Sequence, residues 1–170
     1  MKIKFGVIGQ GHIGKRHAEM VRRNPDTELV AVCDIAAKEK LGLDNLQEAF
    51  YSSAEEMLAK HPEIDVVNVC SPNGLHKTHA LQCLENGKHV VVEKPMALSK
   101  ADCESLIHTA LNAHKQVFCV MQNRYSPPSV WLKKALEEKL LGIRWERLFD
   151  GFEHINRSRP QIQFQKLAMG

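Results

Sequence analysis

The sequence lacks the features that mark membrane proteins. No apolar stretch approaches the roughly 18–20 residues that span a bilayer as a helix. The first residues, MKIKFGVIG, contain neither an apolar segment of signal-peptide length nor a cleavage pattern. We therefore expect a cytoplasmic protein that does not bind membranes.

A strong charge of one sign is also missing. Lysines and arginines are scattered along the chain, and the formal net charge is only +3. A nucleic-acid or acidic-lipid partner usually requires a block of basic residues, so we predict neither. Small anionic molecules stay compatible with this composition.

The cysteines show no spacing typical of a disulfide framework or a metal site. Cys33, Cys70, Cys83, Cys103 and Cys119 are odd in number, form no C-x-x-C pair and lie mostly in apolar runs. We expect buried, reduced thiols.

Signatures of several other site types are missing as well. The chain contains no G-x-S-x-G, no Walker A sequence and no Cys–His catalytic pattern. His76 and His79 share one face of a predicted helix, but no Cys, Asp or Glu completes a zinc ligand set. We therefore predict no metal site.

What the chain does contain is enough apolar material for one core. It has 170 residues, of which 44% are hydrophobic and 25% charged, which are ordinary values for a globular protein. This length suffices for one complete domain and is short for two.

Strand-like and helix-like segments alternate over the first 120 residues. Strands are predicted at about 3–8, 28–34, 49–52, 64–70, 88–92 and 117–121, and helices at about 12–24, from Ser52 onward, at 75–86 and at 99–114. Ser52 is the predicted N-cap, with Glu55 three residues later, and the stretch before Glu48 is polar and helix-prone. Gly87 is a suitable helix C-cap. This alternation predicts an α/β fold, a doubly wound parallel sheet of the Rossmann type with helices on both faces.

The pattern changes after the last strand. We predict a Rossmann-type domain at 1–122, a connecting region at 123–142 with a helix at about 129–140, and an atypical tail at 143–170. The tail is rich in Arg and Gln and shows no clear periodicity.

A glycine-rich turn follows the first strand. GVIGQGHIG places Gly9, Gly11 and Gly14 in a G-x-G-x-x-G sequence at the start of a helix, an arrangement that suits the pyrophosphate of a dinucleotide. Asp34 follows Gly14 by 20 residues, at the end of the second strand. A carboxylate there accepts hydrogen bonds from ribose hydroxyls and repels a 2′-phosphate, so NAD is favoured over NADP. The alternative is a glycine turn that binds nothing.

Three polar clusters follow later strands. They are CSPNGLH at 70–76, EKP at 93–95 and QNRY at 122–125. Because the carboxyl ends of parallel strands share one edge, we expect the clusters to converge there. Lys94 is the sharpest catalytic candidate, since it would carry a charge close to a substrate oxygen. The other interpretation is a surface lysine paired with Glu93.

These motifs together resemble one enzyme family. GVIGQGHIGKRHA, Asp34, VCSPNGLHKTHALQCLENGKHVVVEKPMALS and QNRYSPP, which span about residues 3–130, are similar to the Gfo/Idh/MocA oxidoreductases, NAD(P)-dependent sugar and inositol dehydrogenases. CSPNGLH and QNRYSPP look most like the branch that oxidises UDP-N-acetyl-aminosugar uronates at C3.

The resemblance implies roles for individual residues. The pyrophosphate would be held by the turn Gly9, Gln10, Gly11, His12, Ile13 and Gly14, and the adenosine ribose by Asp34. The nicotinamide half would be lined by Ser71, Pro72, Asn73 and His76, with Glu93 on its ribose. Lys94 would position the reacting hydroxyl, and Asn123 and Arg124 would border the cofactor and the substrate.

Two hypotheses about function follow. The first is hydride transfer between nicotinamide and a carbinol of a sugar or sugar nucleotide, by a protein that forms homo-oligomers at full length. Members of the family normally have a second, substrate-binding domain, so the resemblance implies that this domain is absent from this chain or present only as a remnant in the tail. This chain would then be mainly the cofactor-binding part, with little activity of its own. Asp150 and His154 have the family's D-x-x-x-H spacing, but no Gly-Gly precedes them, so coincidence is favoured. The second hypothesis is a non-catalytic NAD(P)-binding sensor or interaction module.

Overall fold

Six parallel strands form one sheet in the order β3-β2-β1-β4-β5-β6. The computed structural model describes residues 1–138. The strands are β1 (Ile3–Ile8), β2 (Thr27–Cys33), β3 (Ala49–Tyr51), β4 (Val66–Val69), β5 (His89–Val92) and β6 (Val117–Cys119). This order confirms the predicted doubly wound α/β fold.

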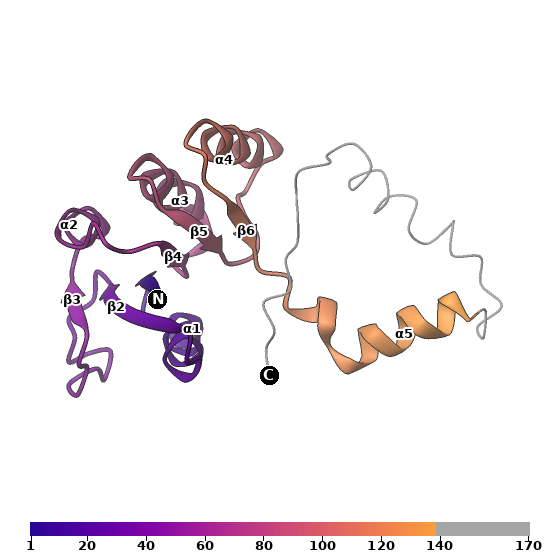
Figure 1. Ribbon diagram of the computed structural model, residues 1–170, viewed down its shortest axis with the longest axis horizontal. Helices are drawn as coiled ribbons and strands as arrows, with labels where there is room; N and C mark the ends of the chain where they lie inside the picture. Colours follow the sequence, from indigo (N-terminus) through magenta and orange to yellow (C-terminus); the bar gives the residue numbers. More distant parts are fainter. Residues whose placement is uncertain (139–170) are drawn as a thin grey trace. The chain divides into compact units, whose positions relative to one another are not determined.

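Helices cover both faces of the sheet (Figure 1). Helix α1 (His12–Arg23) joins β1 to β2 and packs on one face, whereas α2 (Ala54–Lys60), α3 (His76–Glu85) and α4 (Lys100–Asn112) cover the other. The wrapping therefore reverses between β1 and β4, which are neighbours in the sheet.

The two faces carry separate apolar cores. Under α1, Ala18 and Val21 pack with Val7 and Val32 of the strands. Under the other helices, the larger core includes Met57 of α2, Leu84 of α3 and Leu106 of α4. The central valines are fully buried because helices cover the sheet on both sides, which explains why these strands are continuously apolar in sequence.

Two local features differ from what the sequence indicated. The segment between β2 and β3 forms turns and no helix, held by backbone bonds such as that from the Leu46 N–H to the Leu43 carbonyl. Its helix-forming residues gain no stable helix, since propensity alone is a weak determinant without a packed apolar face. The N-cap of α2 is Ser53, not Ser52, because the Ser53 hydroxyl accepts the Glu56 N–H.

A second compact unit begins at Met121, whereas the first comprises Met1–Val120. In the described part of the second unit, a short 3₁₀ helix η2 (Gln122–Tyr125) precedes α5 (Pro127–Glu137). Within residues 1–138, no helix has the length and hydropathy needed to cross a bilayer. The residues of the predicted 143–170 tail, including Asp150 and His154, lie outside the described part of the chain.

Truncating a buried leucine tests this packing. Leu106 is 0% exposed in the core under α4, whereas Leu111 on the same helix is 52% exposed. We expect Leu106→Ala to lower the free energy of unfolding by about 2–5 kcal/mol, because it removes buried methyl groups and leaves a cavity. Leu111→Ala is the control and should change it by less than about 0.5 kcal/mol. Chemical denaturation measures both, and equal losses would contradict the packing described.

Candidate nucleotide-binding site

The turns after β1 and β4 meet at the carboxyl edge of the sheet. Strand β1 pairs with β4 through Ile8 and Val69, and the Cys70 N–H donates to the Ile8 carbonyl at 2.8 Å. The chain leaves β1 toward α1 on one face and leaves β4 toward α3 on the other. Such a reversal opens a crevice between the two turns, which is where open α/β sheets bind ligands.

The glycine turn packs so closely that two of its residues leave no room for a side chain. Gly9 has a φ of +90°, and a Cβ there would lie 2.6 Å from the Cys70 carbonyl oxygen. A Cβ on Gly14 would collide with the carbonyl oxygen of Gly9. These two glycines let α1 begin directly above the turn and beside the end of β4.

Gly11 differs, because a Cβ built on it meets nothing within 4 Å. Its φ of −66° would suit any residue, so the fold itself does not require glycine there. Gly11 is the N-cap of the 12-residue helix α1, which has no side-chain cap and no acidic residue in its first turn. Backbone N–H groups and the positive end of the helix dipole are thus offered to an anion, with open space in front of them.

Asp34 lies beside this turn, as the spacing predicted. Its Oδ2 accepts the Gln10 N–H at 2.6 Å, and its Oδ1 accepts the Ala36 N–H at 2.8 Å. These bonds fix the carboxylate at the end of β2. Because a carboxylate has about four lone-pair sites, acceptor capacity is left for a ligand.

The remaining residues of the turn differ in exposure. The Gln10 side chain is buried, at 1% exposure, so its backbone is what borders the crevice, while Ile13 is 37% exposed. His12, at the start of α1, is exposed as well.

The segment after β4 forms a tight loop. Ser71 is buried and Pro72 is exposed. Asn73, also exposed, begins a 3₁₀ turn, η1 (Asn73–Leu75). His79 of α3 approaches the Ser71 hydroxyl at 2.9 Å through Nδ1. Burial and then the charge of His76 lower the pKa of His79, which favours its neutral form.

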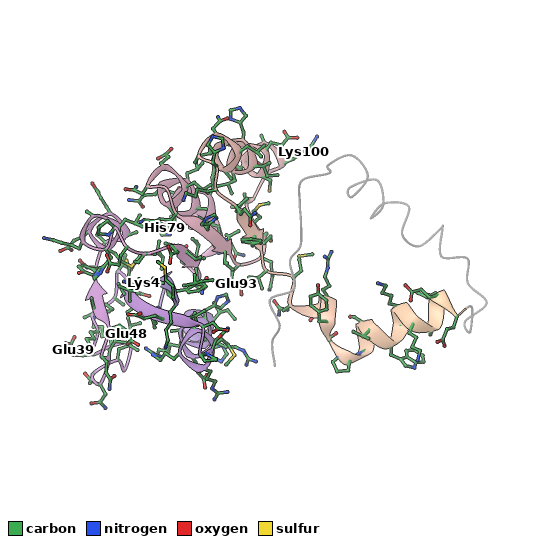
Figure 2. The ribbon with its side chains drawn as sticks, viewed as in Figure 1. Lys4, Glu39, Glu48, His79, Glu93 and Lys100 are labelled. Atoms are coloured by element: carbon green, nitrogen blue, oxygen red, sulfur yellow. The ribbon has the colours of Figure 1, made fainter. Side chains whose placement is uncertain are left out.

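Glu93, labelled in Figure 2, is held by a partner that the sequence pattern did not indicate. The carboxylate is buried at the end of β5, and its Oε1 lies 3.0 Å from Nε2 of His17 on α1. Its Oε2 accepts the Lys94 N–H at 3.2 Å. The two residues are 76 positions apart, and no local signal joins them.

Lys94 is exposed at the same edge, followed by Pro95 across a cis peptide bond. In the described part of the chain, the Glu93 carboxylate pairs with His17, so the surface pairing with Lys94 considered from sequence does not form. Asn123 and Arg124 lie on η2 in the second unit.

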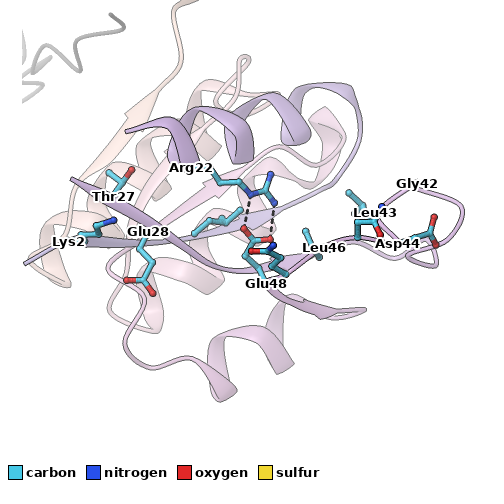
Figure 3. Close-up of a pocket in the computed structure, with 12 residues that line it drawn as sticks. Lys2, Arg22, Thr27, Glu28, Gly42, Leu43, Asp44, Leu46 and Glu48 are labelled. Atoms are coloured by element: carbon cyan, nitrogen blue, oxygen red, sulfur yellow. Dashed lines mark hydrogen bonds and ion pairs between the residues drawn. The ribbon is translucent and has the colours of Figure 1, made fainter. Parts of the chain in front are cut away.

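A cavity of about 610 Å³ opens at the opposite, amino edge of the sheet (Figure 3). It is lined by Lys2 before β1, by the start of β2 from Thr27 to Leu29, and by the segment 42–48 before β3. Arg22 and Glu48 form a two-pronged ion pair across it, with bonds of 2.7 and 2.9 Å. Since the cavity lies at the other edge from the glycine turn, we do not assign the nucleotide to it.

The thiols are free, as predicted. Burial raises the pKa of Cys33, Cys70 and Cys83 to about 12, which makes them poor nucleophiles. Cys103 and Cys119 are only partly buried. In residues 1–138, no three His, Cys, Asp or Glu side chains are grouped as metal ligands.

Comparison with known proteins agrees with this geometry. Residues 3–121 match the GFO_IDH_MocA model, described as an oxidoreductase family with an NAD-binding Rossmann fold. The chain is 33% identical over 146 residues to myo-inositol 2-dehydrogenase of Thermotoga maritima, and 33% identical over 147 residues to D-glucoside 3-dehydrogenase of Escherichia coli. These alignments each cover 82% of this chain, but 42% and 40% of the relatives.

Solved structures give the same result. The WlbA dehydrogenase of Bordetella pertussis, determined in complex with NADH and UDP-GlcNAcA, superposes with a TM-score of 0.75 at 32% identity. The match covers 82% of this chain and 43% of that one. The chain therefore spans about two fifths of the length of these relatives.

A pair of glycine substitutions separates folding from ligand binding. Gly14→Ala should lower the free energy of unfolding by about 1–3 kcal/mol or more, since its Cβ collides with backbone. Gly11→Ala should leave stability within about 0.5 kcal/mol, because the space around it is open. The added methyl would occupy the anion's approach, so we expect about tenfold weaker NADH binding by fluorescence titration. Unchanged affinity in a folded Gly11→Ala protein would contradict the assignment of this turn.

Proposed function

Since the chain belongs to the Gfo/Idh/MocA family of NAD-binding oxidoreductases, we propose that it binds NAD(H) at the carboxyl edge and serves hydride transfer between nicotinamide and a carbinol of a sugar or sugar nucleotide. The observation that carries the proposal is the open space at Gly11, with the Asp34 carboxylate bonded 2.6 Å from the Gln10 N–H beside it. An anion site and a hydroxyl acceptor thus lie side by side, which suits the pyrophosphate and ribose of one dinucleotide.

We propose NAD as the preferred form. The Asp34 carboxylate would accept hydrogen bonds from the adenosine ribose and would repel a 2′-phosphate. Lys38, Lys40 and Arg16 are the cations that could offset this repulsion and allow some NADP binding. The pyrophosphate would be held by the backbone from Gly9 to Gly14.

The loops after β4 and β5 would receive the nicotinamide half. Exposed Asn73 and buried Ser71 border the loop after β4, and Glu93 follows β5. When bound, the nicotinamide accepts or donates the hydride. The protein's part is orientation and charge, and Lys94 would hold the reacting hydroxyl and stabilise negative charge on its oxygen.

The substrate class is inferred from the relatives. Two of them are named for myo-inositol and a D-glucoside, and the WlbA structure contains UDP-GlcNAcA. All are cyclic polyols or sugars with secondary hydroxyls, so we propose a substrate of this kind. Contacts to it from Asn123 and Arg124, and homo-oligomer formation, stay predictions.

Removing the charge of Asp34 tests the cofactor preference. Asp34→Asn should weaken NAD binding about tenfold, because a charge-assisted hydrogen bond to ribose is lost. The affinity for NADP relative to that for NAD should rise by about the same factor, since the repulsion between the carboxylate and the 2′-phosphate is removed. Asp44→Asn is the matched control at the opposite edge and should change neither dissociation constant. Calorimetric titration measures both cofactors, and an unchanged NAD/NADP ratio in Asp34→Asn would argue against this role.

Lys94→Ala separates a dehydrogenase from a module that only binds the nucleotide. Because Lys94 would act on the substrate and not on the cofactor, the NAD dissociation constant should change less than about twofold. Any measured turnover of inositol, a glucoside or UDP-GlcNAcA with NAD should fall by about two to four orders of magnitude. Turnover equal to that of the wild type would remove Lys94 from the mechanism.

A further inference from the structure

His76 is the first residue of α3, and both nitrogens of its ring face backbone carbonyls. Nδ1 lies 2.7 Å from the carbonyl oxygen of Pro95, and Nε2 lies 2.7 Å from the carbonyl oxygen of Ser71. The side chain is only 1% exposed. The sequence had suggested a hydrogen-bonding group turned toward a cofactor, whereas the ring is enclosed behind the loop.

This contact pattern restricts the chemistry of the ring. A carbonyl oxygen can only accept a hydrogen bond, and a neutral imidazole has one N–H. In either neutral tautomer, one ring nitrogen would point its lone pair at a carbonyl oxygen 2.7 Å away, and burial at 1% exposure excludes water as a compensating partner. Only the doubly protonated ring can donate to both oxygens.

We propose that His76 is a positioning residue, an imidazolium that donates to the Ser71 and Pro95 carbonyls and so ties the loop after β4 to the Lys94–Pro95 corner. One carbonyl directly precedes the exposed Pro72–Asn73 segment, and the other directly follows Lys94. A single rigid ring thereby sets the distance between the two segments proposed to border the nicotinamide and the substrate. The consequence for catalysis rests on the proposed function, but the protonation state does not.

The charged groups on α3 and on the elements packed against it pair elsewhere or are exposed. Glu85 of α3, Lys94 after β5 and Glu104 of α4 are among the exposed ones. At the end of β5, the Glu93 carboxylate pairs with His17, and on α4 the Asp102 carboxylate pairs with Lys77. The acidic residues of α2, Glu55 and Glu56, are exposed.

The remaining titratable neighbours carry no negative charge. The Cys70 thiol at the end of β4 has its pKa raised to about 12 by burial, and His79 on α3 favours its neutral form. The imidazolium of His76 is thus stabilised by two peptide carbonyl dipoles and not by a carboxylate within the described residues.

The ring nitrogens can be observed directly by NMR of the ¹⁵N-labelled chain. At about pH 7.5, where a free imidazole is largely neutral, both His76 nitrogens should resonate in the range of protonated ring nitrogens and show slowly exchanging N–H protons. One nitrogen in the range of an unprotonated imidazole would overturn the proposal. Assignment through backbone-to-ring correlations makes this test independent of any variant's folding, and it is unaffected if the chain proves not to bind NAD.

A variant tests the positioning role. His76→Gln can offer a single nitrogen to the two carbonyls, so the backbone amide resonances of Asn73, Lys94 and Met96 should shift or broaden. His108→Gln, on the exposed side of α4, is the matched control and should leave them unchanged. A folded His76→Gln protein with wild-type resonances at these three amides would show that His76 does not position the Lys94–Pro95 segment against the loop after β4. If His76→Gln does not fold, the ring measurement on the wild type decides.

Discussion

The fold and the candidate site both depend on one close backbone contact. The turn after β1 and the end of β4 approach so closely that a side chain on Gly9 or Gly14 would meet backbone atoms. This contact brings the start of α1 beside the loop after β4. It also leaves the backbone N–H groups of α1 open toward the crevice, since nothing fills the space at Gly11. The absence of three side chains thus leaves room for the proposed anion site.

Around that contact, buried polar groups hold the loops in place. Asp34 bonds to the glycine turn, His17 reaches across to Glu93, and His76 joins two loop carbonyls. The bonds from Asp34 to Gln10, from His17 to Glu93 and from His76 to Pro95 link segments that are 24, 76 and 19 residues apart in sequence. Lys94 is left exposed among fixed neighbours. Such a site would hold the proposed cofactor on hydrogen-bonded backbone and present one exposed cation, Lys94, to the proposed substrate.

Much of this arrangement follows from local sequence. Buried parallel strands read as apolar runs, and the spacing from Gly14 to Asp34 predicts their convergence because one helix and one strand lie between them. The pairing of His17 with Glu93 could not be predicted, since it depends on how α1 lies over β5. The enclosed ring of His76 could not be predicted either. A histidine at the start of a helix has the same sequence pattern whether its ring faces solvent or the backbone of a distant loop. The helix-prone segment before Glu48 forms turns instead of a helix, because no packed apolar face supports its helix propensity.

The central claim is that the nucleotide binds at the carboxyl edge, between the turns after β1 and β4. Chemical-shift mapping with NAD tests it most directly. We predict that the perturbed amides cluster at Gly9–Gly14, Asp34–Ala36, Ser71–Asn73 and Glu93–Lys94. The amide resonances of the segment from Gly42 to Gln47, which lines the amino-edge cavity, should stay unchanged. Perturbations confined to that cavity, or spread evenly over the chain, would contradict it.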